Sequence, residues 1–184
     1  MEKQIIATEV ATMAGRGFSH ESGKSTMPEG EENQWFTPQY IFDAIGIEFD
    51  MDPCSPGAGL TNVPAKKHLT IVDDGLITPW EGTVFVNPPY GKHTPEWIKK
   101  LSDHGDGIAL VFARTDVKWF QDNVATCSAV CFISSRVKFH KGHIGDGSQV
   151  GTPGAGSMLM AYGDKAAEAL KNSGLGAVFV YQSS

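Results

Sequence analysis

The sequence predicts an α/β domain in which helices cover both faces of a doubly wound, mostly parallel sheet. Short apolar segments of strand type alternate along the chain with segments that carry helix caps. Strands separated by helices imply a largely parallel sheet, because the helical crossover returns the chain to the same edge of the sheet. The length of 184 residues and the mass of 19.8 kDa suit one compact domain with a single sizeable core.

Caps and apolar runs predict the elements in chain order. Thr37 is an N-cap residue followed by Pro38 at the first helical position, and Gly46 closes this helix. A second helix starts at Thr94 by the same signals and stops near Gly105. Further helices are predicted over 117–124 and 165–172, and strands over 47–51, 83–86, 108–113, 129–134, 157–162 and 177–181.

The composition of the N-terminal segment differs from that of the rest of the chain. Gly, Ser, Thr and Glu dominate from Met13 to Gln34 without a helical or alternating pattern, which predicts a flexible tail over residues 1–33. Residues 34–184 form the predicted domain. Within it, residues 138–156 are glycine-rich and irregular, and their length favours a functional loop over a tight connection.

Composition and charge exclude several classes of protein. With 41% hydrophobic and 20% charged residues the chain is neither wholly disordered nor collagen-like. It contains no apolar run of membrane-spanning length, and three cysteines argue for a reducing compartment, so we expect a cytoplasmic protein. The formal net charge of −6 argues against nucleic-acid binding by charge alone, although the balance reverses between Arg114 and His143.

The strongest chemical signal is Asn87-Pro88-Pro89-Tyr90, directly after a strand of buried type. The two prolines fix the backbone, so the carbonyl of Pro88 is expected to be held rigidly in the open. The side-chain oxygen of Asn87 is a second acceptor, and Tyr90 offers a flat ring for stacking. Two convergent acceptors and a ring suit a planar exocyclic amine, because accepting both amino hydrogens makes the nitrogen nucleophilic without a strong base.

This tetrapeptide resembles the signature of the amino-methyltransferases that use S-adenosylmethionine. The chain more closely resembles the Dam-like DNA N6-adenine methyltransferases of phages and prophages. The resemblance covers residues 35–162 and rests on an ordered set of segments: Trp35-Phe36-Thr37-Pro38, Phe49-Asp50-Met51-Asp52-Pro53-Cys54, Asp73-Asp74-Gly75-Leu76, Trp80, Val86-Asn87-Pro88-Pro89-Tyr90-Gly91, Trp97, Arg136-Val137-Lys138-Phe139 and Ser157.

The resemblance implies a Rossmann-like sheet of the class I methyltransferase type and assigns roles to residues of this chain. Asn87, Pro88, Pro89 and Tyr90 would hold an adenine flipped out of the duplex and present its amine to the sulfonium methyl group. No metal is required, because the sulfonium is already an activated leaving group. The implied location is the cytoplasm of a bacterial or phage-infected cell.

The resemblance also implies a binding site for S-adenosylmethionine. Asp52, Pro53 and Cys54 match the first cofactor motif, although the glycine loop that follows is inexact. Asp74 is the candidate for the adenine amine of the cofactor, with a plain turn aspartate as the alternative. Thr37 and Pro38 would pack beside its methionine end, unless they only cap a helix. The ribose partner stays open, because too few residues separate Asp52 from Asp73 for the usual helix and strand.

Double-stranded DNA is the expected partner, with the protein a monomer or a weak dimer. The DNA-contacting loop is predicted over residues 136–156, and the candidate DNA-binding side chains are Arg114, Arg136, Lys138 and Lys141. A solvated basic face is the alternative explanation of this charge pattern. We expect no metal site, since His140 and His143 have no matching pair and Cys127 and Cys131 fall across a strand.

Two other functions remain open from the residues alone. A methyltransferase could use the same tetrapeptide on RNA or on a protein glutamine. The inexact glycine loop also allows a catalytically decayed module that binds DNA without a cofactor.

Overall fold

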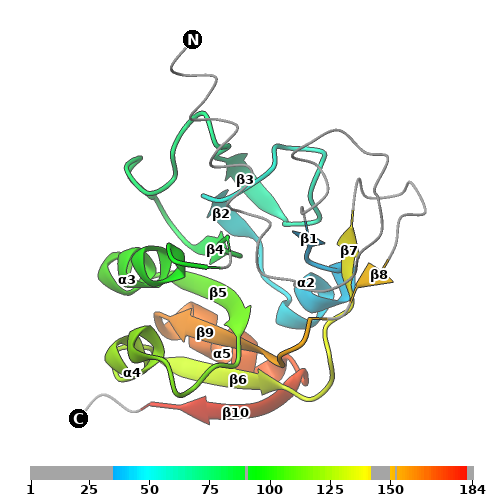
Figure 1. Ribbon diagram of the computed structural model, residues 1–184, viewed down its shortest axis with the longest axis vertical. Helices are drawn as coiled ribbons and strands as arrows, with labels where there is room; N and C mark the ends of the chain where they lie inside the picture. Colours follow the sequence, from blue (N-terminus) through cyan, green and yellow to red (C-terminus); the bar gives the residue numbers. More distant parts are fainter. Residues whose placement is uncertain (1–34, 90, 142–149, 152, 182–184) are drawn as a thin grey trace.

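The computed structural model of the protein describes residues 35–89, 91–141, 150–151 and 153–181 (Figure 1). The predicted tail over residues 1–33, Tyr90 and the middle of the predicted DNA-contacting loop lie outside the described residues. The described part forms a mixed α/β domain around a seven-stranded sheet. The order of the strands across this sheet is β10 (Gly176–Val180), β6 (Ala129–Ile133), β9 (Ser157–Tyr162), β5 (Gly107–Phe112), β4 (Val84–Val86), β2 (Phe49–Asp52) and β3 (Ala65–His68).

The sheet is parallel at one end and antiparallel at the other. The pairs β2–β3, β2–β4 and β4–β5 are parallel, whereas β5–β9, β9–β6 and β6–β10 are antiparallel. The prediction of a mostly parallel sheet therefore holds only for the end from β5 to β3. The difference arises because β9 inserts between β5 and β6 and runs antiparallel to both, and because β10 runs antiparallel to β6.

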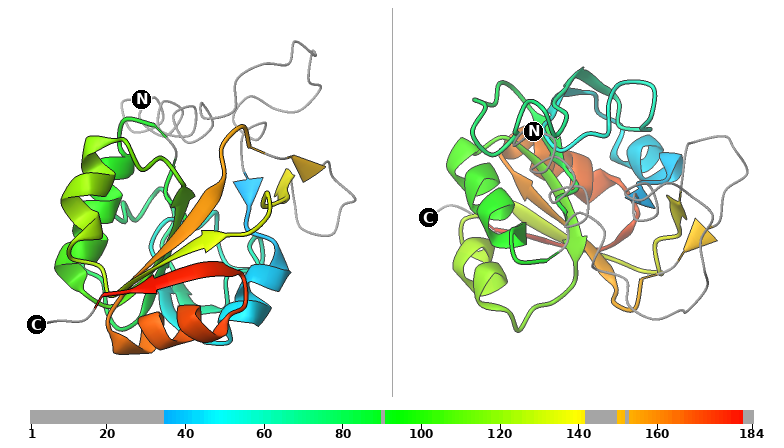
Figure 2. Two further views of the ribbon diagram at one scale, coloured as in Figure 1. Left: turned by 90° about the horizontal axis from the view of Figure 1, so that it is seen from below. Right: turned by 45° about the horizontal axis from the view of Figure 1, so that its top comes forward.

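Helices cover both faces of the sheet (Figure 2). The green helices lie on one face, and the blue and orange helices lie on the other. On one face α2 (Gln39–Ile45) and α5 (Asp164–Asn172) pack against the strands, and Phe85 is fully buried in that core. On the other face α3 (Thr94–His104) and α4 (Lys118–Val124) pack over a second core that includes Val86. The alternation of β4 side chains between the two cores makes its burial complete on both sides.

The predicted helix ends are confirmed at the carboxyl side and are one residue off at the amino side. Gly46 and Gly105 adopt left-handed conformations and close α2 and α3. The N-cap of α2 is Pro38 instead of Thr37, and the N-cap of α3 is His93 instead of Thr94, without a side-chain cap bond in either helix. Both threonine hydroxyls are used elsewhere, as described below.

A second, three-stranded sheet was not predicted. It joins β1 (Trp35–Phe36), β7 (Phe139–Lys141) and β8 (Val150–Gly151) in antiparallel order, with Phe36 opposite His140. The prediction of an irregular segment over residues 138–156 is therefore wrong at both of its described strands. Val137 and Phe139 are fully buried, so a period-two apolar signal was present but was obscured by the surrounding glycines.

No helix within the described residues is long and apolar enough to cross a membrane.

Candidate active site

The predicted site residues meet at the edge where the parallel strands end. Asp52 ends β2, Asn87 follows β4, and Arg114 lies two residues after β5. Because these strands are parallel and in register, their carboxyl ends lie at the same edge of the sheet. Loops that follow the strands can therefore bring functional groups together there.

Asn87 is held by the hydroxyl of Thr37. The amide nitrogen of Asn87 donates to Thr37 Oγ1 at 3.3 Å. Thr37 is itself 4% exposed, and its carbonyl accepts a hydrogen bond from the Asn62 side chain at 3.2 Å. The Thr37 hydroxyl is thus not a helix cap but a fixed acceptor that orients the amide of Asn87.

The segment Asn87-Pro88-Pro89, called the proline shelf below, is only partly covered by protein. Asn87 and Pro89 are half-buried, and Pro88, whose carbonyl was expected to stand in the open, is buried as a whole residue. Tyr90, the predicted stacking residue, lies outside the described residues. The accessible part of the shelf within the described residues comes from Asn87 and Pro89.

Thr94 joins the two peptide groups on either side of position 90. Its Oγ1 donates to the carbonyl of Pro89 and accepts the amide of Gly91, both at 3.1 Å. Thr94 is 5% exposed, so these bonds are protected from competing water. Its place after a glycine-lysine-histidine turn gave only a capping signal in the sequence.

The Asp52-Pro53-Cys54 segment contacts the Asn87 segment directly. Asp52 is 3% exposed, and its Oδ1 accepts the backbone amide of Cys54 at 3.2 Å. The Cys54 thiol lies against the backbone amide of Asn87, and burial raises the pKa of this thiol well above its ordinary value, as does the nearby Asp52. The two sequence motifs therefore form one continuous structure across β2 and β4.

The loop that carries Asp74 is packed onto the same segment. A Cβ at Gly75 would lie 1.9 Å from the carbonyl oxygen of Pro53 and 2.8 Å from the Trp97 ring, so the loop backbone approaches as closely as a glycine allows. The Trp80 indole donates to the carbonyl of Gly75 at 2.7 Å. The ammonium group of Lys100 donates to three carbonyls of residues 75–78 and lies over the Trp80 ring.

Asp74 itself adopts a left-handed conformation, with a φ of 46°, and is exposed. Its Oδ1 accepts the amide of Leu76 at 3.1 Å, which is an Asx-type turn. The turn interpretation of Asp74 therefore has direct support, and its position beside Pro53 keeps it at the edge of the same site.

His68 is a site residue that sequence reasoning missed. It ends β3, a strand that fits between Asp52 and Asp73, where the sequence left too few residues for the usual helix and strand together. Its Nδ1 lies 3.0 Å from Ser55 Oγ and 3.7 Å from Asp52 Oδ2. Ser55 Oγ in turn accepts the amide of Gly57, so the imidazole joins Asp52 to the inexact glycine loop.

The Asp52–His68 contact predicts a pH dependence of stability. The Asp52 carboxylate beside the imidazole raises the pKa of His68 above its ordinary value of 6.5. A pKa raised by folding means that the stabilisation is fully present below about pH 6.5 and is lost as the pH rises through the raised value. We expect the stability advantage of the wild type over His68→Asn to be larger at about pH 5.5 than at about pH 8.5. Urea denaturation at the two pH values measures it, and an advantage that grows toward alkaline pH would contradict the assignment.

The family comparison agrees with this arrangement of motifs. The model of the family described as DNA N-6-adenine-methyltransferase (Dam) matches residues 24–171, which is most of the chain. The protein belongs to the Dam family. Its function is accordingly that of a DNA N6-adenine methyltransferase. No curated protein matches the sequence.

The small sheet places the basic segment of this Dam-family enzyme beside the amide of Asn87. Thr37 directly follows β1, which pairs with β7, and Lys138 directly precedes β7. Lys138 and Arg114 are exposed. Arg136 is also exposed, but its guanidinium donates to the carbonyl of Pro153 at 2.8 Å, so part of its role is to hold the two ends of the 136–156 segment together. Lys141 has its backbone in β7, and its side chain lies outside the described residues.

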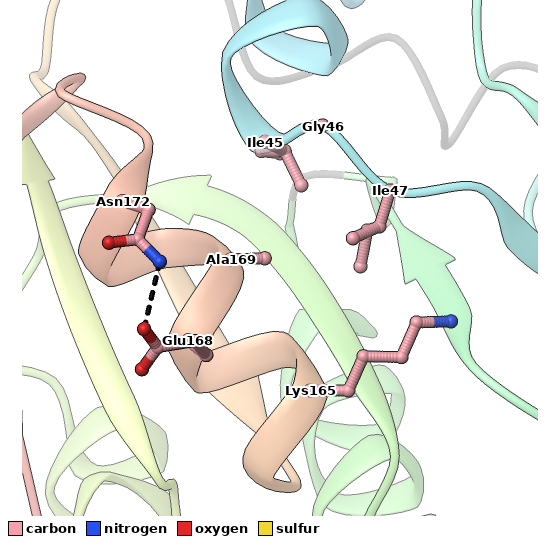
Figure 3. A pocket seen from close by; sticks show the side chains of 7 residues that line it. All are labelled: Ile45, Gly46, Ile47, Lys165, Glu168, Ala169 and Asn172. Carbon is pink, nitrogen blue, oxygen red and sulfur yellow. Dashed lines mark hydrogen bonds between the residues drawn. The ribbon is translucent and has the colours of Figure 1, made fainter.

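A separate pocket of about 400 Å³ lies between the end of α2 and α5 (Figure 3). Ile45, Gly46 and Ile47 line it from the end of α2, and Lys165 and Glu168 line it from α5. Because Gly46 precedes β2 and Lys165 contacts Thr83 at the start of β4, the pocket faces away from Asn87. It is not part of the Dam-family site.

Cys127 and Cys131 are buried and free, as expected for packing residues. Within the described ranges, no group of three or more His, Cys, Asp or Glu residues is placed to hold a metal ion.

Proposed function

We propose that this Dam-family enzyme takes its methyl group from S-adenosylmethionine and transfers it to the N6 amine of an adenine flipped out of double-stranded DNA. The observation that carries the proposal is the contact between the two motifs: Cys54 lies against the backbone of Asn87, whose side chain is oriented by Thr37. A donor held by Asp52, Pro53 and Cys54 would lie next to an amine held by Asn87. The enzyme would act in the cytoplasm of a bacterial or phage-infected cell.

The residues present fit the methyl donor. Asp52 supplies a buried carboxylate beside a half-buried cysteine, which suits a ligand with positive charge and amino groups. The tight packing of Gly75 on Pro53 keeps the Asp74 turn beside them, where its carboxylate can accept from an amine. Pro38 is buried next to Thr37 and would form an apolar wall. When bound, S-adenosylmethionine supplies an electrophilic methyl group that needs no metal activation.

The chain's own residues would position the adenine amine. Thr37 accepts from the amide nitrogen of Asn87, so the amide oxygen is the side that accepts a hydrogen of the target amine. The carbonyl of Pro88 is proposed as the second acceptor, and Pro89 with Tyr90 as the stacking surface. Thr94 would hold the peptide groups around position 90 in the shape that stacking needs. Positioning and exclusion of water are the main contributions of the protein to the rate.

We further propose that DNA lies across Arg114, Arg136, Lys138 and Lys141. Arg114 follows β5 and the others lie in or beside β7, so all four are near the edge that carries Asn87. The sheet order, with β4 between β2 and β5, is consistent with the class I methyltransferase type proposed for the fold.

The test is methyl transfer from labelled S-adenosylmethionine to unmethylated duplex DNA, with N6-methyladenine identified by mass spectrometry. RNA of the same sequence and a glutamine-containing protein serve as competing acceptors. Labelling of DNA adenine supports the proposal. Labelling of RNA or protein alone, or donor-free binding to DNA without transfer, would reject it.

A charge variant tests the proposed DNA face. Lys138→Ala is expected to weaken duplex binding uniformly across sequences and to reduce the slope of log K against log salt by about 1, because one phosphate contact is lost. Lys171→Ala removes an exposed lysine from α5, on a different part of the protein, and should leave both quantities unchanged. Fluorescence anisotropy over a salt series measures them. Equal slopes for Lys138→Ala and the wild type would place the DNA elsewhere.

A further inference from the structure

The two edges of the seven-stranded sheet differ in how they are protected. At one edge, β3 carries Lys66 and Lys67, both exposed, which is a common way to prevent an edge strand from pairing with another chain. At the other edge, the segment Gly176–Tyr181 contains no charged residue and no proline. β10 forms the lower border of the molecule in Figure 1.

The side chains of β10 are apolar and largely exposed. Phe179, Val180 and Tyr181 are 58%, 50% and 44% exposed. Val178 packs partly against the core under α5, and Phe179 contacts the Phe132 ring on the opposite face, so exposed apolar groups occur on both faces at this edge. Exposed apolar side chains on an edge strand can pack, on each face of the sheet, against those of an added neighbouring strand.

The backbone of β10 has hydrogen-bonding groups directed away from the sheet. Tyr181 donates to Ser128, and the carbonyl of Leu175 accepts from Ser134, so the odd-numbered residues exchange bonds with β6. Antiparallel pairing alternates with a period of two. Val178 and Val180 therefore direct their amides and carbonyls away from β6, toward the side on which no other strand of the described residues pairs with β10.

We propose that this edge pairs with the β10 edge of a second copy of the chain, in antiparallel register, to form a two-fold symmetric dimer with one continuous sheet. The charges favour a second copy of the chain as the partner of β10. Two β10 strands would meet without opposed like charges, whereas a β3–β3 contact would place lysines opposite each other. DNA is disfavoured at this edge, because β10 offers no cation for phosphate. A two-fold contact closes on itself, because it uses both β10 edges and leaves only the lysine-bearing β3 strands at the ends of the joined sheet.

The pairing leaves both active sites accessible. Four strand spacings separate β10 from β4, which is about 19 Å at roughly 4.8 Å per strand. A five-residue strand is short, about 17 Å, so the interface is at the small end of specific contacts and we expect a dissociation constant in the micromolar range.

Val180→Pro tests the edge itself. It removes one outward amide without removing a bond to β6, a position where proline is tolerated on an edge strand. Val180→Thr keeps the amide and is the matched control. In sedimentation velocity, the wild type and Val180→Thr should shift from monomer to dimer with concentration, and Val180→Pro should remain a monomer with unchanged methyl transfer per site.

Val180→Lys supplies the same test if the proline variant does not fold, because it copies the protection of β3 at an exposed position. A wild type that stays monomeric at about 100 μM, or a dimer that survives both Val180→Pro and Val180→Lys, would overturn the proposal. Hydrogen exchange adds a direct readout: the amides of Val178 and Val180 should gain protection only as concentration rises. Protection at every concentration would mean that a segment of the same chain, such as residues 1–33, covers the edge, and the proposal would fail.

Discussion

Asn87→Ala is expected to lower methyl transfer to adenine by about 10²–10³-fold while binding of the methyl donor stays nearly unchanged. The reason is geometric. Asn87 contacts the Asp52-Pro53-Cys54 segment, which is the proposed donor site, through its backbone amide, and the substitution keeps this amide. Its side chain contacts Thr37 and is proposed to bind the target amine. Removing one preorganised hydrogen-bonding group from an active site commonly has an effect of this size on turnover.

Single-turnover transfer and calorimetric titration with the donor measure the two quantities separately. Thr37→Val is a second, milder variant, because it keeps Asn87 but removes the hydroxyl that orients the Asn87 amide. Its loss of transfer should be smaller than that of Asn87→Ala, and Thr37→Ser should restore most of the rate. Unchanged turnover in Asn87→Ala would contradict the proposed role. Equal rates for Thr37→Val and Thr37→Ser would show that the hydroxyl does not orient the amide.

Gly75→Ala is expected to destabilise the fold by about 1–3 kcal/mol and to weaken donor binding more than DNA binding. The new methyl group would lie at 1.9 Å from the Pro53 carbonyl, which is backbone and cannot rotate away. The 73–78 loop must therefore move off the Asp52-Pro53-Cys54 segment. Trp80 and Lys100 donate hydrogen bonds to the carbonyls of this loop. Moving the loop would therefore also weaken these bonds, including the one from Lys100 on α3.

Gly154→Ala is the matched control for this variant. Neither glycine has the left-handed φ that favours glycine, and a Cβ at Gly154 meets nothing within 4 Å, so the comparison isolates the steric contact. Thermal unfolding and donor titration of both variants give the measurement. If Gly75→Ala matched Gly154→Ala in both, the loop would not be packed on Pro53 as described.

The elements that could be predicted from the sequence are those with local signals. Glycines that close helices and apolar runs such as Val84–Val86 act over a few residues, and they were located to within one or two positions. The strand pairing could not be predicted in the same way. The insertion of β9 between β5 and β6 depends on where a long segment returns, and no local pattern in residues 157–162 distinguishes a parallel from an antiparallel neighbour.

The candidate site shows the same division. The positions of Asp52 and Asn87 at strand ends follow from the apolar runs before them, and the structure places both at one edge. The functions of the Thr37 and Thr94 hydroxyls were not predicted, because a threonine before a helix carries a strong capping signal that masks any tertiary contact. His68 was missed for a different reason: β3 reads Ala-Lys-Lys-His, which has neither apolar content nor alternation.

The two-residue ladder between β1 and β7 joins the proposed DNA-contacting segment to the residue that contacts the Asn87 amide. Lys138 stands immediately before one strand of that ladder, and Thr37 immediately after the other. In the proposed complex, a phosphate bound by Lys138 would therefore lie two paired residues away from the hydroxyl that contacts the Asn87 amide. DNA that stabilises this ladder would also stabilise the position of Thr37, without a separate recognition domain.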